Sequence, residues 1–283
     1  MIIKAVEFPN QSFATKRDLF LALKSNEDKL ISLKKSCVYK SHEKGQLSFL
    51  NADKVFNAAN KAGIEAKEGF IYPVISTTKY MDSHGDVHFN GCFGKTCKEQ
   101  QGKVLYALDH ELKFDSIIAW QKDVTMFIQN IDWSIVGKGY SGQTEALIFE
   151  IEKSKIARKD VLESIENKSA DFENSIRMIY RKITLGIDSN DKEFTENKAY
   201  YDKRIKEIAN KERVEEVGYF WGVEELEIYK EGSLVVAGGS NDATSIYHKH
   251  TEPSDDTHKI EPVITTQKQP INYSSIIKNL KLS

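Results

Sequence analysis

Short runs of apolar residues dominate the middle of the chain, and several of them alternate with polar residues at every second position. Side chains on a β-strand point alternately to the two faces of a sheet, so this period of two predicts strands with one buried face. The predicted strands cover residues 70–76, 104–108, 126–135, 146–151, 175–187 and 219–237. Glycines at positions 137, 139 and 142 lie between two of these runs and predict a turn.

Other segments carry the spacing of amphipathic helices. Thr15, followed three residues later by Asp18, is typical of a helix start, and apolar residues follow it at helical spacing. Further helices are predicted over residues 52–62, 154–167 and 194–217. Gly63 and Gly218 come directly after two of them, where glycine commonly ends a helix.

Composition divides the chain into three regions. Residues 1–68 are predicted to form a helical appendage, and residues 69–245 hold the strands together with a helical insert at about 190–218. Residues 246–283 contain much Thr, Pro, Asp and Lys without periodicity, which predicts a linker and a tail that is partly disordered. We therefore expect an α+β fold, a mainly antiparallel sheet or β-barrel with helices packed outside it.

Charge and cysteine content limit the classes of function that we expect for this chain. The 283 residues include 40 Lys and Arg against 42 Asp and Glu, a net charge of −2, whereas nucleic-acid-binding domains usually carry a basic excess. No apolar run approaches the roughly 20 residues of a membrane helix, and the first residues lack the apolar core of a signal peptide. We expect no nucleic acid, no membrane, and free thiols at Cys37, Cys92 and Cys97 in a reducing cytoplasm.

Glycine-rich segments give no sign of a nucleotide or another cofactor. The segments GGSND and GKGYSG lack the strand, loop and helix that surround a phosphate-binding loop, so no cofactor is expected. The GxSxG elbow of the α/β-hydrolases is also missing, so any serine chemistry must use another scaffold.

Three polar residues lie at the ends of predicted strands or inside them. Ser175 lies in FENSIRMIY, His110 ends the apolar run of LYALDHE, and Glu231 lies in IYKEGSLV. A serine nucleophile, a histidine base and a carboxylate that orients the imidazole together make a serine hydrolase. Each residue also has a structural interpretation: a serine bonded locally at a strand start, a surface histidine in a turn, and an exposed glutamate on an edge strand.

A second cluster, HGDVHFNGCFGKTC, combines His84, Asp86, His88, Cys92 and Cys97. Cysteine and histidine are the usual zinc ligands, so a zinc-binding module is one alternative. The spacing fits no common structural zinc site, and the glycines with Asp and Asn are typical of a turn, so we expect no metal.

Four sequence blocks, taken in order, resemble one known family. DSHGDVHFNGCF is similar to its Asp-x-x-Gly-Asp segment followed by Gly-Ala-Phe, and LYALDHE to its apolar run that ends in the catalytic histidine. NSIRMIYRKI is similar to its strand bearing the nucleophile, and EGSLVVAGGSNDAT to its closing strand with Glu-x-Ser-x-Val and the turn that follows. Over roughly residues 70–244 the chain resembles a longer branch of the HK97-type prohead (capsid maturation) serine proteases of tailed bacteriophages.

This resemblance implies a fold similar to herpesvirus assemblin, a β-barrel wrapped by helices. It implies a serine-type endopeptidase that cleaves scaffold or capsid-protein segments inside the procapsid, in the cytoplasm of a bacterial host, and that processes itself. The expected partners are the major capsid protein or a scaffold protein, with self-association as a further expectation. The alternative is a non-catalytic capsid-assembly or scaffold protein that keeps the protease fold.

Carried over by position, the resemblance makes Ser175 the nucleophile, His110 the general base and Glu231 the residue that orients the histidine. Glu225 and Glu227 lie in the same run as Glu231, but only Glu231 falls in the Glu-Gly-Ser-Leu-Val pattern. The family usually has a glycine two residues after the serine, whereas this chain has Arg177 there.

Overall fold

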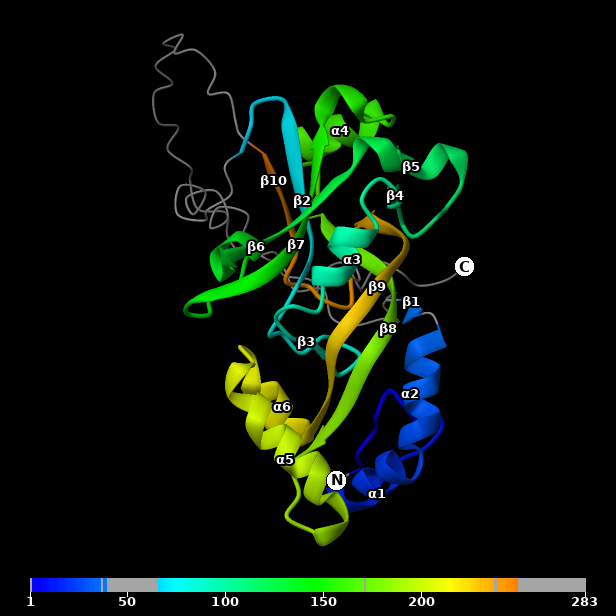
Figure 1. The fold of residues 1–283 in the computed structure, drawn as a ribbon, viewed down its shortest axis with the longest axis vertical. Coiled ribbons are helices and arrows are strands. Elements are labelled where there is room, and N and C mark those ends of the chain that lie inside the picture. The colour runs from blue at the N-terminus through cyan, green and yellow to red at the C-terminus, as the bar shows by residue number, and fades with distance from the viewer. Residues whose placement is uncertain (1, 37, 40–65, 171, 237–238, 249–283) are drawn as a thin grey trace, which may run out of the picture. The chain divides into compact units, whose positions relative to one another are not determined.

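Two β-sheets form the framework of the protein (Figure 1). The structure is a computed structural model, and it describes residues 2–36, 38–39, 66–170, 172–236 and 239–248. The strands of these residues are β1 (Val38–Tyr39), β2 (Phe70–Thr77), β3 (Asp86–His88), β4 (Leu105–Leu108), β5 (Ile117–Ala119), β6 (Thr125–Asp132), β7 (Gln143–Glu152), β8 (Glu173–Ile187), β9 (Tyr219–Val235) and β10 (Ser245–His248). One sheet has the order β1-β8-β9-β4-β5 with β3 also paired to β9, and the other has the order β10-β2-β7-β6. Most pairs are antiparallel, and β9 pairs in parallel with β3 and β4. The expected α+β class with mainly antiparallel strands is confirmed, while the described residues form two sheets and no closed barrel.

The longest strands, β8 and β9, are the centre of the larger sheet. They run antiparallel for most of their length, and β4 lies against β9 on the side away from β8. In this register Ser175 of β8 and Ala107 of β4 both lie level with Ser233 of β9. Three neighbouring strands therefore bring together segments that are far apart in the sequence.

Gly232 allows the centre of the larger sheet to pack tightly. A Cβ atom at this position would lie 2.9 Å from Phe149 Cε2, which is closer than such contacts allow, and a tight 3.2 Å from Ile75 Cγ2. Because side chains alternate along a strand, Glu231 and Ser233 point to the face opposite the one that Gly232 leaves open. Consecutive residues of β9 therefore face the apolar core and the polar side of the sheet in turn.

Helices cover the outside of the sheets. They are α1 (Lys16–Ser25), α2 (Glu27–Ser36), α3 (Gly94–Glu99), α4 (Lys159–Glu166), α5 (Thr195–Arg204) and α6 (Lys211–Val217). The predicted helix start is confirmed, since the Thr15 side chain accepts from the Asp18 N–H and the Asp18 carboxylate accepts in return from the Thr15 N–H. No helix in the described part of the chain is long and apolar enough to cross a membrane.

The two N-terminal helices share the core of the strands. Leu19, Phe20, Leu23 and Leu30 are buried in the same apolar cluster as the central strands, and Figure 1 shows α2 beside β8 and α1 next to α2. From α2, Lys34 Nζ lies 2.5 Å from the buried Asp86 carboxylate. The region predicted as an appendage therefore contributes to one continuous core where the structure describes it.

Several predicted boundaries were wrong for local reasons. The alternation continues to residue 135, but Trp133–Val136 form a 3-10 turn that ends at Gly137, whose φ is 68°. The predicted helix over 194–217 is broken between α5 and α6, because the Asn210 side chain bonds both the N–H and the C=O of Met81. The predicted two final strand runs are one strand, β9, and the linker expected from residue 246 is still strand β10 as far as His248.

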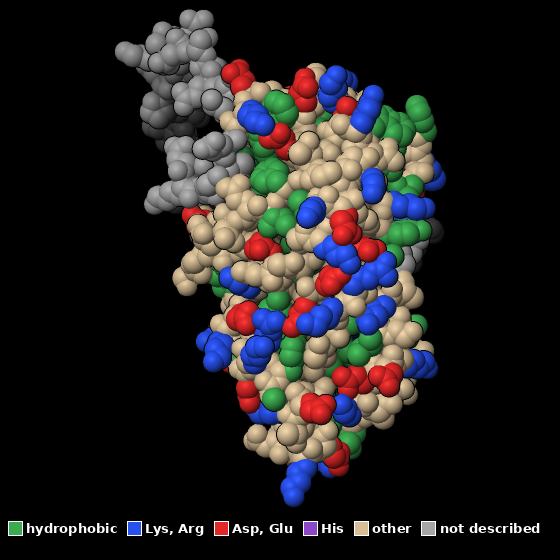
Figure 2. Space-filling view, in the orientation of Figure 1, with side chains coloured by type: hydrophobic (Ala, Val, Ile, Leu, Met, Phe, Trp, Pro, Cys, Tyr) green, Lys and Arg blue, Asp and Glu red, His purple; other side chains and the backbone are tan. Residues whose placement is uncertain are grey.

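Two other predictions lie outside the described residues. These are the helix over 52–62 and nearly all of the tail. On the face drawn in Figure 2, acidic and basic side chains are interspersed, in keeping with the net charge of −2.

Candidate active site

Ser175 lies in the third position of β8 on a polar face of the larger sheet. Its side chain is 4% exposed, and Arg177 follows two residues later on the same face. Directly across the strand pair lies Ser233 of β9. The serine is thus held on a rigid strand rather than on a loop.

His110 reaches Ser175 through an unusual turn at the end of β4. Asp109 and His110 have φ values of 47° and 59°, a left-handed conformation that residues other than glycine rarely adopt. The turn carries the imidazole to the polar face of the sheet, where Nε2 lies 2.8 Å from Ser175 Oγ. The predicted nucleophile and base are therefore within hydrogen-bond distance.

Glu231 completes the arrangement from β9. Its Oε1 lies 2.9 Å from His110 Nδ1, and the residue is 0% exposed. A carboxylate can only accept, so Nδ1 carries the proton and Nε2 of the neutral ring accepts from the Ser175 hydroxyl. The structure brings all three predicted residues together in the order serine, histidine, glutamate. By contrast, Glu225 pairs with Lys95 and Glu227 pairs with Arg181.

A bulge in β9 precedes Glu231. In the pairing of β8 and β9, residues 229–231 lie opposite the single residue Arg177, and Lys230 within the bulge has a φ of 71°. Bulges bend a strand and re-aim its side chains. The bulge therefore sets the direction in which Glu231 projects.

Ser233 links the carboxylate to the backbone of the histidine. Its hydroxyl donates to Glu231 Oε2 at 2.6 Å and accepts from the His110 N–H at 3.1 Å. Sequence reasoning did not single out Ser233, although its place two residues after Glu231 put it on the same strand face.

Arg177 occupies the place where the resembled family has glycine, and its side chain is directed into the site. Nη2 donates to the His110 carbonyl at 2.8 Å, and Nε lies 3.4 Å from Glu231 Oε1. The residue is 7% exposed, so its positive charge lies inside the protein next to the carboxylate. The sequence pointed to this position only as a departure from the family pattern.

Asn174 fixes the start of the strand that carries Ser175. Its Oδ1 accepts from the Tyr106 hydroxyl at 2.7 Å, and its Nδ2 donates to the Ser245 carbonyl at 2.8 Å and to the Val74 carbonyl at 3.3 Å. These contacts join the larger sheet to β2 and β10 of the smaller one. Sequence patterns gave no sign of this role, because a polar residue in an apolar run does not reveal its partners.

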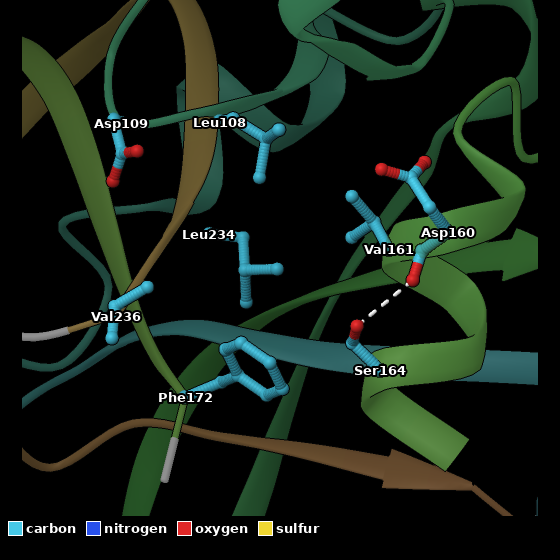
Figure 3. A pocket seen from close by; sticks show the side chains of 8 residues that line it. All are labelled: Leu108, Asp109, Asp160, Val161, Ser164, Phe172, Leu234 and Val236. Atoms are coloured by element: carbon cyan, nitrogen blue, oxygen red, sulfur yellow. Dashed lines mark hydrogen bonds between the residues drawn. The ribbon is translucent and has the colours of Figure 1, made fainter. Parts of the chain in front are cut away.

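A pocket of about 140 Å³ lies between α4 and the ends of β4 and β9. Figure 3 shows Phe172, Leu234 and Val161 directed into it, with Asp109 and Asp160 on opposite sides. Leu234 comes directly after Ser233 in β9, so it projects to the sheet face opposite the one that carries the Ser175 side chain. We therefore assign this pocket no part in the chemistry of the serine.

The second polar cluster of the sequence contacts other side chains in the structure. The buried Asp86 carboxylate bonds Lys34 Nζ at 2.5 Å and accepts from the Tyr180 hydroxyl at 2.7 Å. Burial raises the pKa of the Cys92 thiol well above its usual value, which disfavours the thiolate that binds zinc. Among the described residues, no three His, Cys, Asp or Glu side chains are placed to hold a metal ion.

No protein-family model, curated protein or solved structure matches this chain.

Proposed function

We propose that the chain is a serine-type endopeptidase in which Ser175 is the nucleophile, His110 the general base and Glu231 the residue that orients it. One observation carries the proposal: His110 lies between Ser175 Oγ at 2.8 Å and Glu231 Oε1 at 2.9 Å. Such a line of contacts is the mark of an activated serine, whatever scaffold presents it.

The reaction would be acyl transfer in two steps. His110 Nε2 accepts the hydroxyl proton as Ser175 Oγ attacks the carbonyl carbon of a peptide bond, and the imidazolium then donates that proton to the departing amine. Water attacks the acyl-enzyme in the second step, with His110 again as the base, and Ser175 is restored. Throughout, the Glu231 carboxylate stabilises the imidazolium and keeps the ring in the required tautomer.

The biological setting we propose is maturation of a tailed-phage prohead. The four ordered sequence blocks support it, and they also support a fold related to that of assemblin for the two sheets. The substrates would be scaffold or capsid-protein segments inside the procapsid, in the cytoplasm of the bacterial host, and the protease would also cut itself.

Labelling with a fluorophosphonate, which reacts with activated serines, tests the chemistry directly. We expect the purified full chain to label once, at Ser175, as located by peptide mass spectrometry. Ser175→Ala should abolish labelling, while Ser141→Ala, at an exposed serine in a turn, should leave it unchanged.

Two results would count against the enzyme. A folded wild-type chain that never labels would favour the non-catalytic assembly role. Labelling at another serine would remove Ser175 from the mechanism. Co-expression of wild-type and Ser175→Ala chains with a tailed-phage major capsid protein then tests the substrate, since only the wild type should shorten that protein.

A further inference from the structure

The backbone of His110 needs support that the three catalytic side chains alone do not provide. Asp109 and His110 are consecutive left-handed residues, with φ values of 47° and 59°, and neither is glycine. Such a conformation persists only where surrounding contacts hold it. A base displaced by as little as 1 Å loses much of its efficiency, so these contacts matter for catalysis.

Two side chains from different strands hold the main chain of His110 at both ends. Ser233 of β9 accepts from its N–H at 3.1 Å, and Arg177 of β8 donates to its C=O at 2.8 Å. Both residues are buried, at 0% and 7% exposed. The histidine is therefore fixed at four points, two on the ring and two on the backbone.

Arg177 also changes the charge balance of the site. In a triad made only of serine, histidine and a carboxylate, the carboxylate charge faces the imidazolium alone. Here the guanidinium lies 3.4 Å from the same Glu231 oxygen that contacts His110 Nδ1. The guanidinium and the imidazole therefore share one buried carboxylate.

We propose that Arg177 is a positioning residue of the site: with Ser233 it holds the left-handed main chain of His110, and its guanidinium lies against the Glu231 carboxylate that contacts the ring. The inference rests on the proposed serine chemistry, and it concerns a residue that replaces the glycine of the resembled family. The guanidinium acts through Glu231 and the His110 main chain.

The plateau rate of fluorophosphonate labelling, measured from pH 5 to pH 9 on the full chain, reports how well His110 is positioned. We expect Arg177→Met to lower the plateau rate about 10-fold or more. Arg177→Lys keeps the charge but not both contacts, so its plateau should lie between those of Arg177→Met and the wild type. Ser233→Ala removes a neutral contact to the same main chain and should also lower the plateau.

Arg181→Met is the matched control, because Arg181 lies four residues along the same strand and pairs with Glu227 on the surface. It should leave the plateau at the wild-type value. A wild-type plateau in Arg177→Met, or in both Arg177→Lys and Ser233→Ala, would overturn the positioning role. If Arg177→Met does not fold, as judged by circular dichroism, Arg177→Lys and Ser233→Ala still decide the role. A wild-type chain that does not label would instead refute the proposed enzyme.

Discussion

Ser175 and Ser233 lie directly opposite each other on β8 and β9, yet they contact different parts of the same histidine. Ser175 Oγ meets the ring at Nε2, and Ser233 Oγ accepts from the backbone N–H. The two hydroxyls are therefore not equivalent. Ser175 is the nucleophile in our proposal, and Ser233 holds the His110 backbone and the buried Glu231 carboxylate in place.

Replacing Glu231 with glutamine should show how much of the role of this residue depends on its negative charge. Glu231→Gln keeps a side chain that can reach Ser233 and His110, but it removes the charge and permits the wrong ring tautomer, so we expect labelling to slow by about 100-fold or more. It also leaves Arg177 buried beside a neutral group, so the free energy of unfolding should fall by about 3 kcal/mol. Labelling kinetics and urea denaturation measure the two effects. Glu227→Gln, at a glutamate on the same strand paired with Arg181, is the control and should change the labelling rate little.

The buried pair of Lys34 and Asp86 should anchor helix α2. Lys34→Met removes the cation from a carboxylate that is 1% exposed, and loss of one partner of such a pair costs about 3–5 kcal/mol. Urea denaturation measures the change, with Lys35→Met at the exposed neighbour as the control. The double variant Lys34→Met/Asp86→Asn should recover part of the loss. A single variant as stable as the wild type would mean that α2 is held by its apolar face alone.

A methyl group at Gly232 should strain the core beneath the site. Gly232→Ala would place a Cβ atom 2.9 Å from Phe149, and forcing an extra methyl into a packed core costs about 1–3 kcal/mol. Thermal and urea unfolding report the loss, and Phe149→Leu in the same chain should relieve part of it. Gly139→Ala is the matched control, since nothing lies within 4 Å of a Cβ atom there. Equal stability of the two alanine variants would contradict the packing argument.

The Cys92 thiol should resist alkylation until the chain unfolds. Burial raises its pKa well above the usual value, and the thiolate is the reactive form. We expect iodoacetamide at pH 8 to leave Cys92 unmodified in the native protein and to modify it in denaturant, as followed by mass spectrometry. Proton linkage gives the direction in which the free energy of unfolding changes with pH. Above the pKa of about 9.0 that the thiol has in the unfolded chain, the unfolded chain loses a proton that the native thiol keeps. This group therefore lowers stability as pH rises beyond that value, and Cys92→Ala should weaken the alkaline decline.

Local patterns were enough to predict much of the framework. The strands around residues 70–76 and 146–151 and the helix start at Thr15 follow from alternation and from a capping pair, both of which are encoded within a few residues. Trp133 continued an alternating run but lies in a 3-10 turn, because Gly137 ends the segment in a left-handed conformation. Short-range signals do not show which of two local geometries the surrounding structure will select.

The site was only partly visible in the sequence. Ser175, His110 and Glu231 were chosen together through the ordered blocks, since each had an ordinary structural interpretation when taken alone. Ser233 and Asn174 were not identified, because their importance depends on strand register and on contacts between sheets. The β9 bulge that directs Glu231 has no sequence signature either, since its left-handed residue is a lysine rather than a glycine.

The spacing of the triad along the chain has a consequence for the timing of activity. His110 is separated from Ser175 by 65 positions and from Glu231 by 121, and β9 must pair with both β4 and β8 before the three can meet. During synthesis the serine and the histidine leave the ribosome well before the glutamate that orients them. Under the proposed serine chemistry, a nascent or half-folded chain would therefore lack an activated serine, and cutting would begin only once the last long strand has docked.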